Sequence, residues 1–185
     1  MKDEAMIRLA LECGAHAAAV LPAGQIVRNA EFREMCRSNR CGVYGRCYMC
    51  PPDVGEIEDL MHRLEDYDRG LLYQTVSPLE DSFDVEGMAR AREEMTALSQ
   101  RLLDVLPPLT GSHALHLSCG GCGLCRECGR VSGEACRHPD RALASLESYG
   151  IDVYNTARNT PLHYVNGPDT VTYFGMVLYG EKNNG

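Results

Sequence analysis

The spacing of apolar residues along the chain predicts alternating helices and strands. Helical periodicity is expected over 3–13, where Gly14 ends the helix, over 54–68, and over 84–106, where Pro107-Pro108 stops it. Apolar and β-branched runs predict strands over 15–23, 69–77, 112–118 and 170–180. We therefore expect a fold of the α/β or α+β class, with about four strands in one sheet and helices packed against it.

Two shorter helices complete the predicted pattern. One is expected over 28–36, and another over about 140–149, with Pro139 in its first turn and Gly150 as its C-terminal cap. Residues 151–159 are predicted to form a loop or a short helix.

Two segments, 36–52 and 119–139, follow neither the helical nor the strand period. Both are dense in cysteine and glycine, and we expect them to be metal-binding loops that project from the ends of the sheet. The whole chain, 1–185, is short enough to form a single metal-binding domain. The loops contain these candidate metal ligands: Cys36, Cys41, Cys47 and Cys50 in the first segment, and Cys119, Cys122, Cys125, Cys128 and Cys136 in the second.

Composition and charge narrow the possible environments and partners. A net charge of -8 and a pI of about 5.2 argue against binding to nucleic acid or to an anionic membrane surface. No stretch approaches the roughly 18 apolar residues that a membrane span requires, and the start has no cleavable signal pattern, so a cytoplasmic protein is expected. Thiols stay reduced in the cytosol, where clustered cysteines are more often metal or redox ligands than disulfides.

The second segment has the spacing of an iron–sulfur site. Four of its cysteines recur at intervals of three, and Cys136 follows eight residues later. A C-x2-C-x2-C turn can wrap three thiolates around one [4Fe–4S] cluster, and a remote cysteine completes the shell. The triplet could begin at Cys119 or at Cys122, with Cys136 as the natural remote ligand. Zinc is the main alternative, because paired C-x2-C units also form tetrahedral thiolate sites.

The first segment provides four more thiols, and Cys50 is followed by Pro51-Pro52, which is typical of the last ligand of a cluster. Three arrangements remain open. Each segment could hold its own cluster, ligands could cross between the segments, or the first loop could bind one zinc ion or only pack against the second site.

The remaining candidates are weaker. Cys13 is expected to be a buried, apolar thiol. His113 and His116 are three apart in a predicted strand, which places them on opposite faces and makes a shared metal improbable. His138 could donate a hydrogen bond to a cluster sulfur. The sequence contains no phosphate-binding loop, nucleophile elbow or catalytic triad, so no catalytic residue is assigned.

The motifs CGVYGRCYMCPP (41–52), CGLCRECGRVSGEACRHP (122–139) and SLESYGIDVYNTA (145–157) resemble a family of predicted metal-binding proteins of unknown function from anaerobic bacteria and archaea. The resemblance covers nearly the whole chain, with Tyr48 where the family commonly has tryptophan. It implies that Cys47, Cys119 and Cys13 are additions to the family pattern and rank below the other positions as ligands. The matched positions are Cys36, Cys41, Cys50, Cys122, Cys125, Cys128 and Cys136.

Three functions are compatible with these features. The first is an electron-transfer or redox accessory protein of anaerobic metabolism with one or two [4Fe–4S] clusters and a redox protein as partner. The second is a small reductase in which a cluster with an open coordination position meets substrate, motivated by the odd number of matched thiols. The third is a zinc-binding structural module or metallochaperone.

Overall fold

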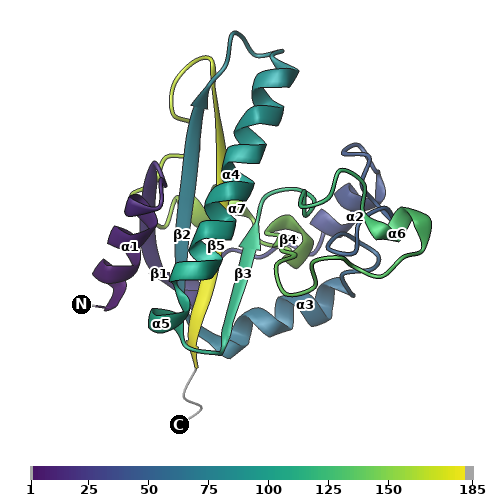
Figure 1. The fold of residues 1–185 in the computed structure, drawn as a ribbon. Helices are drawn as coiled ribbons and strands as arrows, with labels where there is room; N and C mark the ends of the chain where they lie inside the picture. Colours follow the sequence, from purple (N-terminus) through teal and green to yellow (C-terminus); the bar gives the residue numbers. More distant parts are fainter. Residues whose placement is uncertain (1, 182–185) are drawn as a thin grey trace.

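A mixed sheet of five strands forms the centre of the protein, in a computed structural model that describes residues 2–181 (Figure 1). The strands lie in the order β1-β2-β5-β3-β4, and all neighbouring pairs are antiparallel except β3 and β4. Their bounds are β1 Ala17–Pro22, β2 Tyr67–Pro78, β3 Ala114–Ser118, β4 Ala144–Ser145 and β5 Thr170–Glu181.

The long pair of β2 and β5 carries the core because successive side chains point to opposite faces. Leu71 and Tyr73 face one side of the sheet with Val177, whereas Leu72 faces the other with Met176. Tyr73 is accommodated by Gly175 opposite it, where an added Cβ would lie 2.3 Å from the phenol oxygen.

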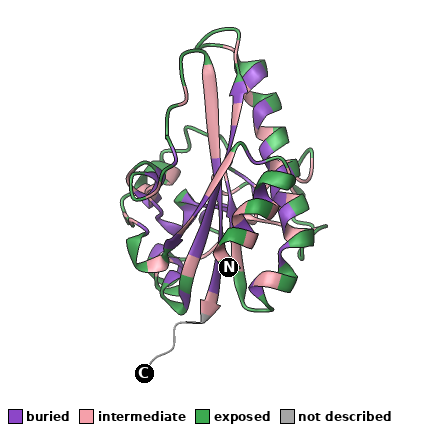
Figure 2. Cartoon of the chain, turned by 90° about the vertical axis from the view of Figure 1, so that its left-hand side faces the viewer, coloured by how far each residue is buried: buried purple, intermediate pink, exposed green. Residues whose placement is uncertain are grey.

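Helices cover both faces of this sheet, so the buried residues run along its middle (Figure 2). The first core lies under α1 (Lys2–Glu12) and α4 (Val85–Val105). The second lies under α3 (Ile57–Arg63), the 3-10 turn η3 (Glu147–Tyr149) and α7 (Val153–Ala157). The shorter elements are α2 Phe32–Arg37, α5 Pro107–Thr110, α6 Gly129–Ser132, η1 Ala23–Gln25 and η2 Leu64–Asp66.

The expected mixed α/β class is confirmed, but the sheet has five strands rather than about four. The helix predicted over 140–149 is wrong, because β4 and η3 occupy that segment. Leu146 donates its N–H to the carbonyl of Ser118 (3.0 Å), and the Ser145 hydroxyl accepts the N–H of Ser148 (3.0 Å). These bonds hold the segment at the edge of β3 and compete with helix formation.

Two other helices are shorter than their sequence period suggests. The predicted helix over 28–36 begins only at Phe32, because Arg28 forms a β-bridge with Ile151. The helix predicted over 54–68 is limited to α3 and η2, since Tyr67 already begins β2. No helix in the described part of the chain is long and apolar enough to cross a membrane.

Candidate metal centre

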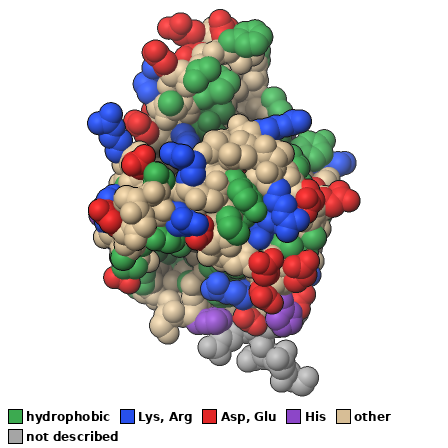
Figure 3. Space-filling model, turned by 90° about the vertical axis from the view of Figure 1, so that its right-hand side faces the viewer, with side chains coloured by type: hydrophobic (Ala, Val, Ile, Leu, Met, Phe, Trp, Pro, Cys, Tyr) green, Lys and Arg blue, Asp and Glu red, His purple; other side chains and the backbone are tan. Residues whose placement is uncertain are grey.

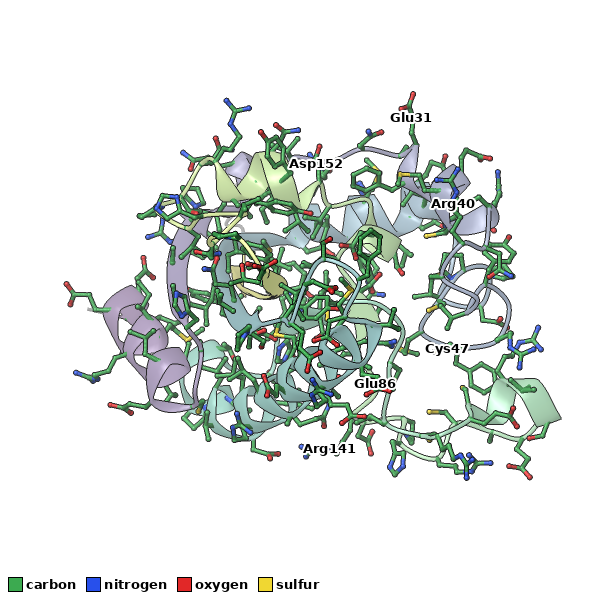
Figure 4. The ribbon with its side chains drawn as sticks, turned by 90° about the horizontal axis from the view of Figure 1, so that it is seen from above. Glu31, Arg40, Cys47, Glu86, Arg141 and Asp152 are labelled. Atoms are coloured by element: carbon green, nitrogen blue, oxygen red, sulfur yellow. The ribbon has the colours of Figure 1, made fainter. Side chains whose placement is uncertain are left out.

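Residues 31–54 and 119–143 pack together as a cysteine lobe beside the sheet, on the right in Figure 1. The Tyr48 hydroxyl donates to the carbonyl of Glu134 (2.7 Å), and Arg130 Nε donates to Asp53 Oδ1 (2.7 Å). Figure 4 shows Cys47 on the side of the first segment that faces the second. Cysteines far apart in sequence are therefore neighbours in space.

Tight turns shape the first cysteine segment. Cys36 lies in the last turn of α2, after which the chain reverses through Gly42 and Gly45 at φ of 74° and 67°, a region that favours glycine. The Cys50 N–H bonds to the carbonyl of Cys47 (3.0 Å), which closes the C-x2-C turn. The segment thus wraps its thiols around a small volume instead of forming a regular element.

The second cysteine segment starts from the sheet itself. Cys119 directly follows β3, so its backbone is anchored by the last rungs of the strand. Cys128 then caps the N-terminus of α6. Gly129 permits a close crossing of the chain, because a Cβ there would lie 2.8 Å from the carbonyl oxygens of Glu134 and Ala135. The loop can return toward Cys136 only because this position has no side chain.

A cavity of about 270 Å³ is lined by thiols from both segments. Its wall also includes Arg92 from α4 and Glu147 from η3, with Tyr173 of β5 at its side. Cys119 joins this cavity although it begins the second segment. We name these residues the first thiol set: Cys36, Cys41, Cys50 and Cys119.

A second, much smaller cavity, of about 40 Å³, lies beside α6. It shares most of its thiols with a groove of about 720 Å³ that runs between α4 and residues 121–128. Of the shared thiols, Cys47 is buried and the others are half-buried. His138 also lines the cavity. We name its cysteines the second thiol set: Cys47, Cys122, Cys125, Cys128 and Cys136.

The two thiol sets adjoin one another. The Cys47 and Cys50 thiols are hydrogen-bonded, which lowers the pKa of Cys47 to about 5 and, together with burial, raises the pKa of Cys50. An added Cβ at Gly121 would lie 3.6 Å from the Cys50 sulfur, so the second segment passes directly over the first set. The C-x2-C pairs 47/50 and 119/122 each contribute one thiol to each set.

Burial raises the pKa of three further thiols. It raises the pKa of Cys36 and Cys122, and it raises the pKa of Cys119 to about 11. Burial by the surrounding protein also raises the pKa of the Glu147 carboxyl, although this side chain is exposed at the cavity. Metal binding to these three thiols must therefore displace protons.

The structure separates the weaker candidates from both sets. Cys13 packs against the core under α1 and α4 and lines neither cavity. His113 stacks on Tyr67 with ring centroids 4.9 Å apart, whereas His116 Nε2 lies 2.7 Å from the Tyr73 hydroxyl. The two histidines therefore have different surroundings and share no site.

A buried polar chain connects the sheet with the first thiol set, and no sequence pattern predicted it. The Tyr73 hydroxyl lies between His116 Nε2 (2.7 Å) and Ser99 Oγ (2.8 Å), and Ser99 Oγ lies 2.9 Å from Ser118 Oγ. Ser118 immediately precedes Cys119. These contacts fix the end of β3 from which Cys119 departs.

The residues present fit metal chemistry to different degrees in the two sets. All ten cysteines are unbridged, and thiolates bind both iron–sulfur clusters and zinc. The first cavity has room for a group of several atoms. The second cavity, at about 40 Å³, is several times smaller than the first. Within residues 2–181, no three His, Cys, Asp or Glu side chains are already placed to hold a single metal ion.

The fold and the two thiol-lined cavities define a cysteine-rich protein equipped to bind metal. The chain belongs to the family described as "Predicted metal-binding protein (DUF2284)", whose model matches residues 19–179. The family resemblance found in the sequence is thereby confirmed. No curated protein and no solved structure is significantly similar to the chain.

Proposed function

We propose that this protein is an electron-transfer protein that holds iron–sulfur clusters in its two thiol sets and exchanges single electrons with a redox protein partner. One observation carries the proposal, namely that four thiols from both cysteine segments line one cavity of about 270 Å³. Four thiolates around a multi-atom space are what a [4Fe–4S] cluster requires. Such clusters supply one-electron transfer.

The chain itself contributes anchoring. Cys119 is held by β3, and Cys36 by α2, which fixes two of the four thiols on regular elements. Cys50 is buried and Cys36 and Cys119 are half-buried, whereas Cys41 is exposed, so the first set meets solvent on the side of Cys41. A rigid site limits the reorganisation that accompanies a change of charge.

The second set supports a second cluster near the surface. Cys122, Cys125 and Cys128 form the C-x2-C-x2-C triplet, and Cys136 is the remote thiol. Because the sets adjoin, electrons could pass from the groove side to the first set. The redox partner would then bind at the groove between α4 and residues 121–128, next to the second set.

Zinc in the second set is the other candidate, and the small volume of its cavity favours it. A single ion bound by four thiolates needs less space than a cluster. The reductase hypothesis loses its motivation, because Cys119 provides the first cavity with a fourth thiol.

The test is anaerobic purification followed by analysis of iron, zinc and acid-labile sulfide, with visible and EPR spectra before and after dithionite. About eight iron and eight sulfide per chain support two clusters, and about four of each with one zinc support the mixed arrangement. A colourless protein with zinc alone contradicts the electron-transfer function.

A further inference from the structure

Two arginines beside the first thiol set have no carboxylate partner. Arg33, on α2, is only 5% exposed, and its guanidinium donates to the carbonyls of Gly55 (2.7 Å) and Ser148 (3.4 Å). Its Nε has no hydrogen-bond acceptor. Cys36 lies one helical turn further along, and the positive charge of Arg33 opposes the rise that burial causes in the pKa of Cys36.

Arg92 approaches the same thiols from α4. Its Nη2 donates to the carbonyl of Gly121 (2.9 Å), and an added Cβ at Gly120 would lie 3.3 Å from its Nε. The glycines of the second segment therefore leave room for this guanidinium. Arg92 lines both the first cavity and the groove, so it stands between the two.

Neither guanidinium forms an ion pair within residues 2–181. Burying an unpaired charge, as at Arg33, is unfavourable, and hydrogen bonds to carbonyls offset only part of the cost. Arg92 is half-buried. The only carboxyl group that lines the first cavity, among the residues described, is that of Glu147. The two guanidinium groups beside this cavity therefore exceed its one carboxyl in charge, and an anionic centre bound there would supply further negative charge.

We propose that Arg33 and Arg92 are the internal counter-cations of the centre held by Cys36, Cys41, Cys50 and Cys119, and that they raise its reduction potential. The inference rests on the proposed function, since it concerns a cluster bound to these thiols. Reduction adds one negative charge to a cluster, and a fixed positive charge nearby favours the reduced form. Both arginines thus act through their charge, which stabilises the reduced form of the cluster.

The second thiol set has a different cation beside it. Arg137 lines its cavity and hydrogen-bonds to the Cys125 thiol, but it is half-exposed and already paired with Glu134 (2.5 Å). The basic side chains that are spread over the outer face of the cysteine lobe (Figure 3) are in contact with solvent, which screens them. Arg92 borders both sets, so the buried and unpaired Arg33 is the cation that distinguishes the first set from the second.

The test is a redox titration of the anaerobically purified protein, followed by EPR, with iron and sulfide measured on every sample. The Cys125→Ser variant should lose the centre of the second set, so the EPR signal that remains in it belongs to the first set. Arg92→Gln and Arg33→Met remove charge, Arg92→Lys and Arg33→Lys retain it, and Arg8→Gln is a matched control on the exposed surface of α1.

At the potential where the first cluster of the unmodified protein is half reduced, Arg92→Gln should lower the ratio of reduced to oxidised cluster about tenfold or more. Arg92→Lys and Arg8→Gln should leave it nearly unchanged. If Arg33→Met does not fold, the Arg92 pair carries the test alone. An Arg92→Gln protein with full iron and an unshifted titration overturns the inference while the proposed function stands. Absence of iron from the unmodified protein overturns both.

Discussion

The two thiol sets use similar ligands in contrasting surroundings. The first set encloses about 270 Å³ beside the sheet, with thiols on α2 and at the end of β3, and two unpaired arginines next to it. The second set surrounds about 40 Å³ in a loop that borders an open groove. The difference teaches that cysteine spacing defines the donors, whereas the elements that carry them determine enclosure, charge and access.

Single ligand substitutions test this contrast with the largest expected effect. Cys119→Ser should remove the first centre, and Cys125→Ser the second, because each deprives one set of a thiolate. With two clusters, each variant should lose about half of the iron and sulfide, measured on protein purified without oxygen. Cys13→Ser is the control and should retain all of it. Full iron in the Cys119→Ser protein would show that the first cavity is not a cluster site.

Metal removal should increase hydrogen exchange in the cysteine lobe but not in the sheet. After anaerobic chelation, amides in 36–53 and 119–139 should exchange hydrogen rapidly, since these segments contain mainly turns and depend on their ligands for order. Amides of β2 and β5 should remain protected, because the two cores hold them on both faces. Hydrogen exchange followed by mass spectrometry measures both regions at once. Equal protection of the lobe with and without metal would contradict the expected dependence.

The fifth thiol of the second set provides a finer comparison. Cys136→Ser should lose the second centre, whereas Cys47→Ser should keep its iron, since the triplet and Cys136 already provide four thiolates. The expected difference is about four iron per chain with a cluster, or one zinc in the mixed arrangement. The reverse pattern would assign the fourth ligand to Cys47.

The smallest expected effect concerns the polar chain behind Cys119. Burial lowers the pKa of His116 from its ordinary value of 6.5 to about 3. Between these values the unfolded chain binds a proton that the folded protein does not, so this stabilising contribution is complete above pH 6.5 and declines as the pH falls. The decline should be at most about 1.4 kcal/mol per pH unit. His116→Phe should reduce the pH dependence of the free energy of unfolding, measured by urea unfolding between pH 7.5 and 5.5. An unchanged pH dependence would exclude His116 as its source.

Much of the fold could be predicted from periodicity. The apolar spacing of 84–106 and the β-rich run at 170–180 correspond to α4 and β5. The segment 140–149 could not be predicted, because its β4 pairing depends on Ser118, which is distant in sequence. The local helix signal at Pro139 was overridden by that tertiary contact, whereas Gly150 caps the short helical turn η3.

The candidate site was predictable in composition but not in pairing. The spacing pointed to both cysteine segments, and crossing of ligands was one of the open arrangements. Cys119 and Cys47 were ranked low because the family pattern lacks them, yet they line the first and second cavities respectively. The roles of Arg33 and Arg92 had no sequence signal, since an isolated arginine on a helix is usually solvated.

The position of β5 has a consequence for how the protein is made. β5 lies between β2 and β3 but follows every other strand in the chain, so β3 gains that partner only after β5 has been synthesised. Cys119 departs from β3, and its final position depends on that pairing. We therefore expect metal binding at the first set to follow the synthesis of β5, so that bound metal would mark chains whose sheet has closed.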